Sequence, residues 1–482
     1  MHRSARLCPG PVSRRSVLEV GSLGLGMLGL SDFLRLKANA SHPASADPSF
    51  ADPASADPGT SIIFIWLPGG PPHMEMYDMK PDAPLDYRGE FRPISTNVAG
   101  LDVCELMPLH AKCADRYNII RSVAHEFADH GGGHKRFLTG RHPATPTGFV
   151  NDAPAVGSIV AKCREHYSTG LPNYVSGAES GRDAVDVYSF GAAYLGPSYV
   201  PFSVPGDPNA SDFRVQNLSV DRSVGDRLNA RAELLNGFDQ LKRSIDSSGL
   251  MTAMDTFNQQ ALSMLTSDKA RVAFDLTLES DAVRDRYGRH AWGQRALMAR
   301  RLVEAGSSFV TMVMENPYVS GIPWLKQGTY NWDSHAVNCH LFDDAKVRLP
   351  IYDQAVTALV EDIYARGLDR RVMLVVTGEF GRTPRLNSTT GSQTGVLQPG
   401  RDHWPQAMSM LVCGGGMRTG QVIGATNSKG EEPSERPLTP NDLWATVYRH
   451  LGIDYHQSFL DHSGRPMPIL PYGRPIAELL PA

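Results

Sequence analysis

Histidines, carboxylates and glycines gather in four short polar segments of this 482-residue chain, each beside an apolar run. Loops at the carboxyl ends of strands are where open α/β sheets bind their ligands. Histidine and carboxylate side chains are ligands that suit zinc, manganese or iron. The pattern therefore predicts a metal-assisted active site. The four segments are Asp129–His134, Trp332–His335, Gly378–Thr383 and Arg401–Trp404.

The segment that begins at Asp129 is the most specific of the four. Its three successive glycines, Gly131 to Gly133, let the backbone come close to a ligand, and a helix after them would offer free N–H groups to an anion. We therefore predict His130 as a catalytic residue, with Asp129 and His134 as additional candidates. The alternative is a glycine-rich turn that holds a hydrogen-bonded histidine.

Asp333 and His335 are two residues apart. On extended backbone two such side chains lie on one side and can share a metal, whereas on a helix they point apart. We predict both as metal ligands, and His340 either joins them or lies at the surface. The alternative for Asp333 is an aspartate that only caps a turn.

The last two segments add two further metal ligands, Glu379 and His403. Glu379 stands two residues after a predicted buried strand, where it would act as a ligand or a general base; a solvated acid is the alternative. Arg382 would steer an anionic substrate, and Asp402 would support a ligating histidine from behind.

Apolar runs predict the strands that position these segments. Continuous apolar runs are typical of strands buried on both faces, as in parallel sheets. The helical patterns that alternate with them predict an α/β fold: one αβα sandwich with a mostly parallel central sheet. Further site candidates, His73 and Asp78, follow the first run. The runs are Ser61–Leu67, Asn118–Val123, Ser308–Met314, Val372–Thr377 and Ala407–Val412, and the helices Ala291–Gly306, Pro350–Arg366 and Pro440–Leu451.

The N-terminus carries a targeting signal. Arg14 and Arg15 precede an apolar, glycine-rich run, and Ala38-Asn39-Ala40 fits a cleavage site, so residues 1–40 predict a twin-arginine signal peptide. An uncleaved anchor is the alternative. Residues 41–60 predict a disordered linker, and 61–482 one domain with a helical insertion at about 221–289. We expect a periplasmic or secreted protein, exported folded and without a membrane span after cleavage.

The net charge and the cysteines bear on which partners and which disulfides to expect. The net charge of −4 gives no electrostatic reason to expect nucleic acid or an anionic membrane as a partner. Five cysteines follow the signal without Cys-x-x-Cys spacing, which favours scattered buried thiols, although Cys104 and Cys113 are close enough in sequence to bridge. Nothing in the sequence indicates the oligomeric state.

At these residues the chain resembles the alkaline phosphatase superfamily. Asp129-His130 and Thr139-Gly140 keep the spacing of its Asp-Ser and Thr-Gly nucleophile motif, with His130 in the nucleophile's place. Glu379, His403 and the Asp333–His335 pair resemble its metal ligands, the pair at a shorter spacing. The whole mature chain is similar to an exported family known as domain of unknown function 1501, on Leu67–Pro71, Asp281–Gly288, Gly378–Pro384 and Arg401–Pro405.

The chain departs from the superfamily in ways that bear on its activity. No Ser, Thr or Cys stands at the nucleophile position, no carboxylate directly follows the first strand, and Phe380 replaces a metal histidine. A Cys-x-Pro-Ser-Arg motif is also missing, which argues against a formylglycine sulfatase.

Two functions follow from this reading. The first is an exported metal-dependent hydrolase of phosphate or sulfate esters, acting on a small-molecule or glycan-linked anionic ester. Its nucleophile would be a metal-activated water or His130, with Glu379 or His130 as general base. The second is a non-catalytic exported protein that binds an anion or glycan on the same scaffold.

Overall fold

The computed structural model describes residues 59–167, 170–179, 189–215 and 268–481. The predicted signal peptide, nearly all of the linker and residues 221–267 of the predicted insertion lie outside the described residues. The rest of that insertion, residues 268–289, contains two helices and a short 3₁₀ helix that pack beside the helices following them in sequence.

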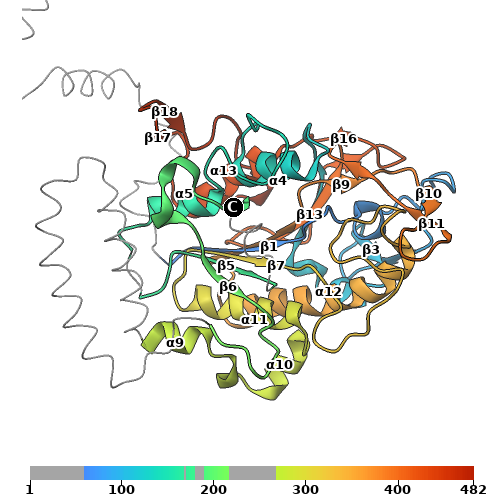
Figure 1. Cartoon of the computed structure of the whole chain (residues 1–482), viewed down its shortest axis with the longest axis horizontal. Coiled ribbons are helices and arrows are strands. Elements are labelled where there is room, and N and C mark those ends of the chain that lie inside the picture. The colour runs from blue at the N-terminus through green and yellow to red at the C-terminus, as the bar shows by residue number, and fades with distance from the viewer. Residues whose placement is uncertain (1–58, 168–169, 180–188, 216–267, 482) are drawn as a thin grey trace, which may run out of the picture. The chain divides into compact units, whose positions relative to one another are not determined.

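The centre of the described chain is an eight-stranded sheet (Figure 1). Neighbouring strands pair in parallel, except that one strand, β13, is antiparallel to both of its neighbours. In spatial order the strands are β14 (Val422–Ile423), β4 (Asn118–Val123), β13 (Met408–Gly414), β8 (Val372–Thr377), β1 (Ser61–Trp66), β7 (Phe309–Val313), β5 (Tyr174–Ala178) and β6 (Phe202–Pro205).

Helices cover both faces of this sheet, as Figure 1 shows. Alternate residues of β1 face opposite layers. Ile63 and Ile65 belong to the core shared with α11 and α12, whereas Phe64 and Trp66 pack on aromatic rings of α13 and α4. One layer holds α9 (Asp268–Phe274), α10 (Asp281–Tyr287), α11 (Ala291–Glu304) and α12 (Leu341–Ala365); the other holds α4 (His130–Thr139), α5 (Val156–Cys163) and α13 (Pro440–His450).

Shorter elements join these layers. A five-residue helix, α3 (Pro108–Lys112), contacts α12. The antiparallel pair of β9 (Gly381–Arg382) and β12 (His403–Trp404) places His403 opposite Arg382. The other two-stranded pairs are β2 (Pro93–Ser95) with β3 (Asp102–Cys104), β10 (Asn387–Thr390) with β11 (Leu397–Gly400), β15 (Ala425–Thr426) with β16 (Pro433–Glu435), and β17 (Ser458–Leu460) with β18 (Pro466–Pro468). The 3₁₀ helices are η3 (His73–Glu75), η4 (Ala114–Arg116), η5 (Ala193–Leu195), η6 (Pro197–Tyr199), η7 (Leu276–Leu278) and η8 (Ala477–Leu479).

The predicted αβα arrangement with a mostly parallel sheet is confirmed, and the five predicted strands lie in one sheet. Three strands of this sheet were missed, β5, β6 and β14, because they are short or rich in small and polar residues. The long helix begins at Leu341, not at Pro350, and the His340 ring accepts the Asp343 N–H at its start. Pro350 stands inside the helix at an exposed position, where solvent can reach the carbonyl that its missing N–H leaves without a donor.

The described cysteines are free thiols, so Cys104 and Cys113 do not bridge. Burial raises the pKa of each of these two thiols to about 12, which keeps them protonated and unreactive. In the part of the chain that the structure describes, every helix is too short or too polar to cross a membrane.

Candidate metal centre

The site lies at the carboxyl edge of the parallel strands. The chain leaves β4 and enters α4 at His130, leaves β8 just before Glu379, and reaches Asp333 in the loop after β7. Because β13 is antiparallel, the chain that enters it also starts from this edge, which brings in His403 on β12. Residues far apart in sequence therefore meet here.

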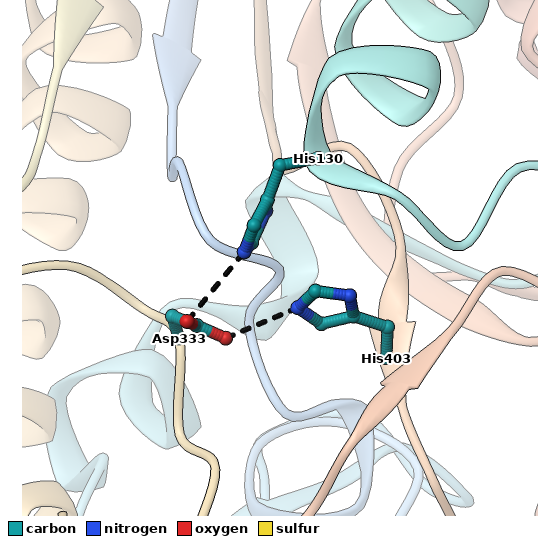
Figure 2. Close-up of side chains that lie close together, drawn as sticks. All are labelled: His130, Asp333 and His403. Carbon is teal, nitrogen blue, oxygen red and sulfur yellow. Dashed lines mark hydrogen bonds and ion pairs between the residues drawn. The ribbon is translucent and has the colours of Figure 1, made fainter. Parts of the chain in front are cut away.

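Asp333 is the centre of the site. His130 and His403 point their rings at its carboxylate from opposite elements (Figure 2). The distance from Nε2 of His403 to Oδ1 of Asp333 is 3.2 Å, and that from Nε2 of His130 to Oδ2 is 3.5 Å. Nε2 of His335 lies 3.1 Å from Oδ1. One carboxylate thus faces three imidazoles.

Each of these imidazoles has its other ring nitrogen held by an acceptor. Nδ1 of His403 donates to the backbone carbonyl of Ala128 (2.6 Å), and Nδ1 of His335 donates to the Asp402 carboxylate (2.6 Å). Nδ1 of His130 faces Oε1 of Glu379 at 2.8 Å. Metal-ligating histidines are held in this way, since the partner of one nitrogen fixes the lone pair on the other.

The charge state of His403 leaves its contact with Asp333 without a proton between the two atoms. Burial, together with the positive charge of Arg382, lowers the pKa of His403, although Asp333 opposes that shift. A neutral His403 that donates from Nδ1 carries a lone pair on Nε2. That lone pair faces a carboxylate oxygen, so two acceptors oppose each other, and a cation between them would satisfy both.

The carboxylates stay ionised in this environment. Burial alone would raise the pKa of Asp333, but the neighbouring rings of His130, His335 and His403 and the charge of Arg382 hold it far below its ordinary value. Burial is likewise outweighed at Glu379, whose pKa is lowered by His134 and His130. For His130, the two carboxylates overcome burial and raise the pKa to about 9. Without a cation, protonated His130 donates one N–H toward Asp333 and the other to Glu379.

Glu379 lies behind His130 and is fully buried. The backbone N–H of Gly69, just beyond β1, donates to both of its oxygens at 2.8 and 3.1 Å. Nε2 of His134 is 3.3 Å from Oε1. Gly69 was therefore missed at the sequence level, although its backbone N–H follows the first strand where the superfamily has a carboxylate. The Pro68-Gly69-Gly70 turn was the only signal for it.

Arg382 differs from the prediction that it steers an anionic substrate. Its side chain is fully buried, and the guanidinium donates to the carbonyls of Gly69, Gly70, Trp332 and Arg401 and to Oδ1 of Asp333 (2.6 Å). With its donors engaged, Arg382 holds Asp333 in place. Asn338 supports the other oxygen of Asp333 from 2.9 Å.

The start of α4 also differs from the prediction of a free anion site. The Asp129 side chain accepts the N–H groups of Gly131 and Gly132 as the helix cap, and its carbonyl accepts from Gly133. The glycines are needed for another reason: Gly133 lies against the Phe380 ring, where a Cβ would come within 2.9 Å of it.

Two combinations of described residues place three ligand atoms within 4.8 Å of one another: His130, Asp333 and His403, and His130, His134 and Glu379. The first set contains His130 where His335 was predicted. His335 remains beside Asp333, tied to Asp402, which Asn387 holds in turn at 2.6 Å. Asp402 therefore supports His335 and not its sequence neighbour His403.

His73 and Asp78 do not join this cluster. The Nε2 of His73 donates to the carbonyl of Gly430, and its Nδ1 accepts the backbone N–H of Arg382. Asp78 is buried against Lys80 and Thr426. His340 caps α12. His73 therefore supports Arg382 from behind, whereas Asp78 binds residues outside the cluster.

A family model described as "Protein of unknown function (DUF1501)" matches residues 59–480. The chain belongs to this family. A search of curated proteins found no match. Among solved structures, Ps i-CgsB shares 10% identity with a TM-score of 0.36, over 82% of this chain and 72% of that one.

Two further solved structures are similar at the same distant level. The lipoteichoic acid synthase LtaP from Listeria monocytogenes shares 11% identity with a TM-score of 0.35, over 86% of this chain and 76% of that one. Alkaline phosphatase from the Antarctic bacterium TAB5 shares 9% identity with a TM-score of 0.32, over 81% of this chain and 98% of that one.

Proposed function

We propose that this protein is an exported metal-dependent hydrolase of phosphate or sulfate esters. The observation that supports a metal most directly is the pair of opposed acceptors at Asp333. Because Nδ1 of His403 donates to the Ala128 carbonyl, its Nε2 carries a lone pair when the ring is neutral, and this nitrogen lies 3.2 Å from Oδ1 of Asp333. His130 and His335 aim at the same carboxylate. A small divalent cation resolves this opposition.

The residues fit such a cation in size and chemistry. Ligand atoms bonded at about 2.1 Å in a tetrahedral shell lie about 3.4 Å apart, and the Nε2 atoms of His403 and His130 lie 3.2 Å from Oδ1 and 3.5 Å from Oδ2 of Asp333. One carboxylate with imidazoles suits zinc, manganese or iron better than calcium. When bound, the cation would polarise the ester oxygen and activate water.

The protein's own residues set the conditions for this chemistry. Arg382 fixes Asp333 by a buried ion pair of 2.6 Å. The Phe380 ring lies 4.5 Å from the His403 ring and 5.4 Å from the His130 ring, and it keeps water away from that side. Low local polarity strengthens the attraction between a cation and its ligands.

The geometry favours water over His130 as the nucleophile. Both ring nitrogens of His130 face a carboxylate, Asp333 on one side and Glu379 on the other. Glu379 is fully buried, so it acts through His130 and does not reach a substrate. We therefore propose that His130 is a ligand and that Glu379 orients it.

Turnover of aryl phosphate and aryl sulfate esters tests the proposal, measured with and without a chelator. His403→Ala should no longer hold the cation at Asp333, and its activity should fall by a factor of about 100 or more. His166→Ala is the control, because His166 is 88% exposed and remote from the site. Zinc content equal to that of the wild type in the His403 variant would remove this residue from the ligand set.

Cation binding without turnover of any ester would favour the second function, a binding protein for an anion or glycan. The proposed place of action is outside the cytoplasm, because Arg14 and Arg15 stand in a twin-arginine signal pattern. Cell fractionation tests that location, and accumulation of mature protein in the cytoplasm would refute it.

A further inference from the structure

The glycines at the start of α4 admit a neighbouring loop. A Cβ on Gly131 would collide with the backbone carbonyl of Gly148, and one on Gly132 would lie 3.0 Å from the carbonyl oxygen of Pro146. Because these two glycines directly follow His130 in the first turn of the helix, the loop lies beside the candidate metal centre. The glycine run therefore seats a second segment at the edge of the site.

This loop, residues 144–150, is tied to the helix. Nζ of Lys135, a residue that is only 3% exposed, donates to the carbonyls of Thr145 (2.7 Å) and Thr147 (3.1 Å). The carboxylate of Asp152 accepts a backbone N–H at the start of the loop. These contacts fix where the loop stands relative to α4.

Two large apolar side chains of the loop stand near the site. The Phe149 ring packs edge-on against the His134 ring at a centroid distance of 5.4 Å. On its other side, Nε2 of His134 lies 3.3 Å from Oε1 of Glu379. Phe149 is nevertheless 36% exposed, and Val150 is 62% exposed. The loop thus presents apolar surface to solvent one ring away from Glu379.

This surface carries no charge and borders an open site. Residues 144–150 read Ala-Thr-Pro-Thr-Gly-Phe-Val, without an ionisable side chain. The site beside it is open to solvent, since the side chains of His130 and Asp333 are 26% and 17% exposed. An apolar group carried by an anion at Asp333 would gain by covering the loop, whereas a charged group would find no partner on it.

We infer that loop 144–150 selects the alcohol part of the ester, and that Phe149 and Val150 favour a bulky apolar group there over a small one. This inference rests on the proposed function, because it concerns the group that hydrolysis would release. It narrows the substrate class to phosphate or sulfate esters of apolar alcohols. In this role the two side chains touch the substrate and set specificity, while the ligands of the cation do the chemistry.

Two matched pairs of compounds test this inference: phenyl and ethyl phosphate for turnover, and phenylphosphonate and methylphosphonate for binding by calorimetry. Phe149→Ala and Val150→Ser should each lower the ratio of kcat/KM for phenyl phosphate to that for ethyl phosphate by about tenfold. Phenylphosphonate should lose a similar factor in affinity relative to methylphosphonate. Phe149→Leu keeps an apolar side chain and should retain most of the preference.

Leu278→Ser is the matched control. Leu278 is also an exposed apolar residue (56%), but it lies in η7, which packs on α11 in the opposite layer of the sheet. This variant should leave both ratios unchanged.

The ratios separate specificity from packing, because a disturbed His134 would slow both esters alike. Equal losses for the two esters, or an unchanged ratio in both Phe149→Ala and Val150→Ser, would overturn the inference and leave the proposed function intact. A wild type that hydrolyses neither phosphate nor sulfate esters would contradict the proposed function. The phosphonates then decide the role of the loop: a preference for phenylphosphonate that Val150→Ser removes would support it, and equal affinities in the wild type would overturn it.

Discussion

At the scale of single residues, Gly69 allows the end of β1 to pack closely against the Asp333 loop after β7 and against Glu379 after β8. Its φ of +108° belongs to a region that side chains avoid, and a Cβ there would lie 2.5 Å from the backbone nitrogen of Asp333. The same residue donates its N–H to Glu379. A glycine is therefore required both for the turn after β1 and for the contact with the Asp333 loop.

Gly69→Ala should destabilise the protein by about 2–4 kcal/mol and weaken zinc binding at Asp333, because strain and backbone contact add. Urea unfolding and zinc titration measure the two effects. Gly100→Ala is the matched control: its φ is +80°, but nothing lies within 4 Å of the added Cβ. It should cost about 1 kcal/mol and leave zinc affinity unchanged. Equal losses in both variants would show that strain alone matters at Gly69.

At the scale of elements, a buried ion pair fastens the β11–β12 segment to the first part of the domain. Arg401, two residues before His403, donates to both oxygens of Glu75 in η3, and both side chains are fully buried. Its remaining donors bind the carbonyls of Tyr87, Thr383 and Pro384. This tie sets the position from which His403 reaches the site.

Glu75→Gln should lower the free energy of unfolding by about 3–5 kcal/mol, because it leaves the Arg401 charge buried without its counter-ion. Glu478→Gln breaks the exposed pair with Arg436, whose side chains are 34% and 42% exposed, and should cost less than about 1 kcal/mol. Denaturant midpoints of the two variants give the comparison. A loss at Glu75 no larger than that at Glu478 would contradict the role assigned to the tie.

The elements also show how far sequence reasoning reaches. Strong apolar runs predicted β1, β4, β7, β8 and β13 nearly to the residue, because strands buried on both faces need them. The residue types at the site were found for the same reason: they follow or precede those runs. The hydrogen-bond partners of these residues could not be predicted from the sequence. Whether Asp402 supports His335 or His403, for example, depends on how β9 and β12 pair. Arg382 was misread because nothing local shows that an arginine is buried.

At the scale of the whole molecule, buried neutral histidines predict loss of stability in acid. Burial lowers the pKa of His73 and of His290 from 6.5 to about 4. In each ring Nδ1 accepts a backbone N–H, from Arg382 and from Gly293, and protonation would abolish that bond. Their contribution to stability is present above pH 6.5 and is lost as the pH falls to about 4, because only the unfolded chain takes up protons in that window.

Unfolding free energies between pH 7 and pH 4 check this expectation. His73→Gln and His290→Gln should each flatten the pH dependence by an amount on the order of 2 kcal/mol. His166→Ala, at an 88% exposed position, should leave the slope unchanged. A slope that stays the same in both glutamine variants would assign the acid sensitivity to other groups.

The reversed direction of β13 has a consequence for the order of assembly. Because that strand starts at the ligand edge, the chain must return to this edge after β8, where β12 pairs with β9 and brings His403 to Asp333. The other ligands come from positions 130 to 379, so the centre depends on contacts between distant parts of the chain, which form slowly. A nascent chain that stops short of residue 403 has Asp333, His130 and His335 but lacks the third imidazole that faces the carboxylate. If the proposed cation binds at Asp333, a chain truncated before residue 403 should hold it more weakly than the full chain does.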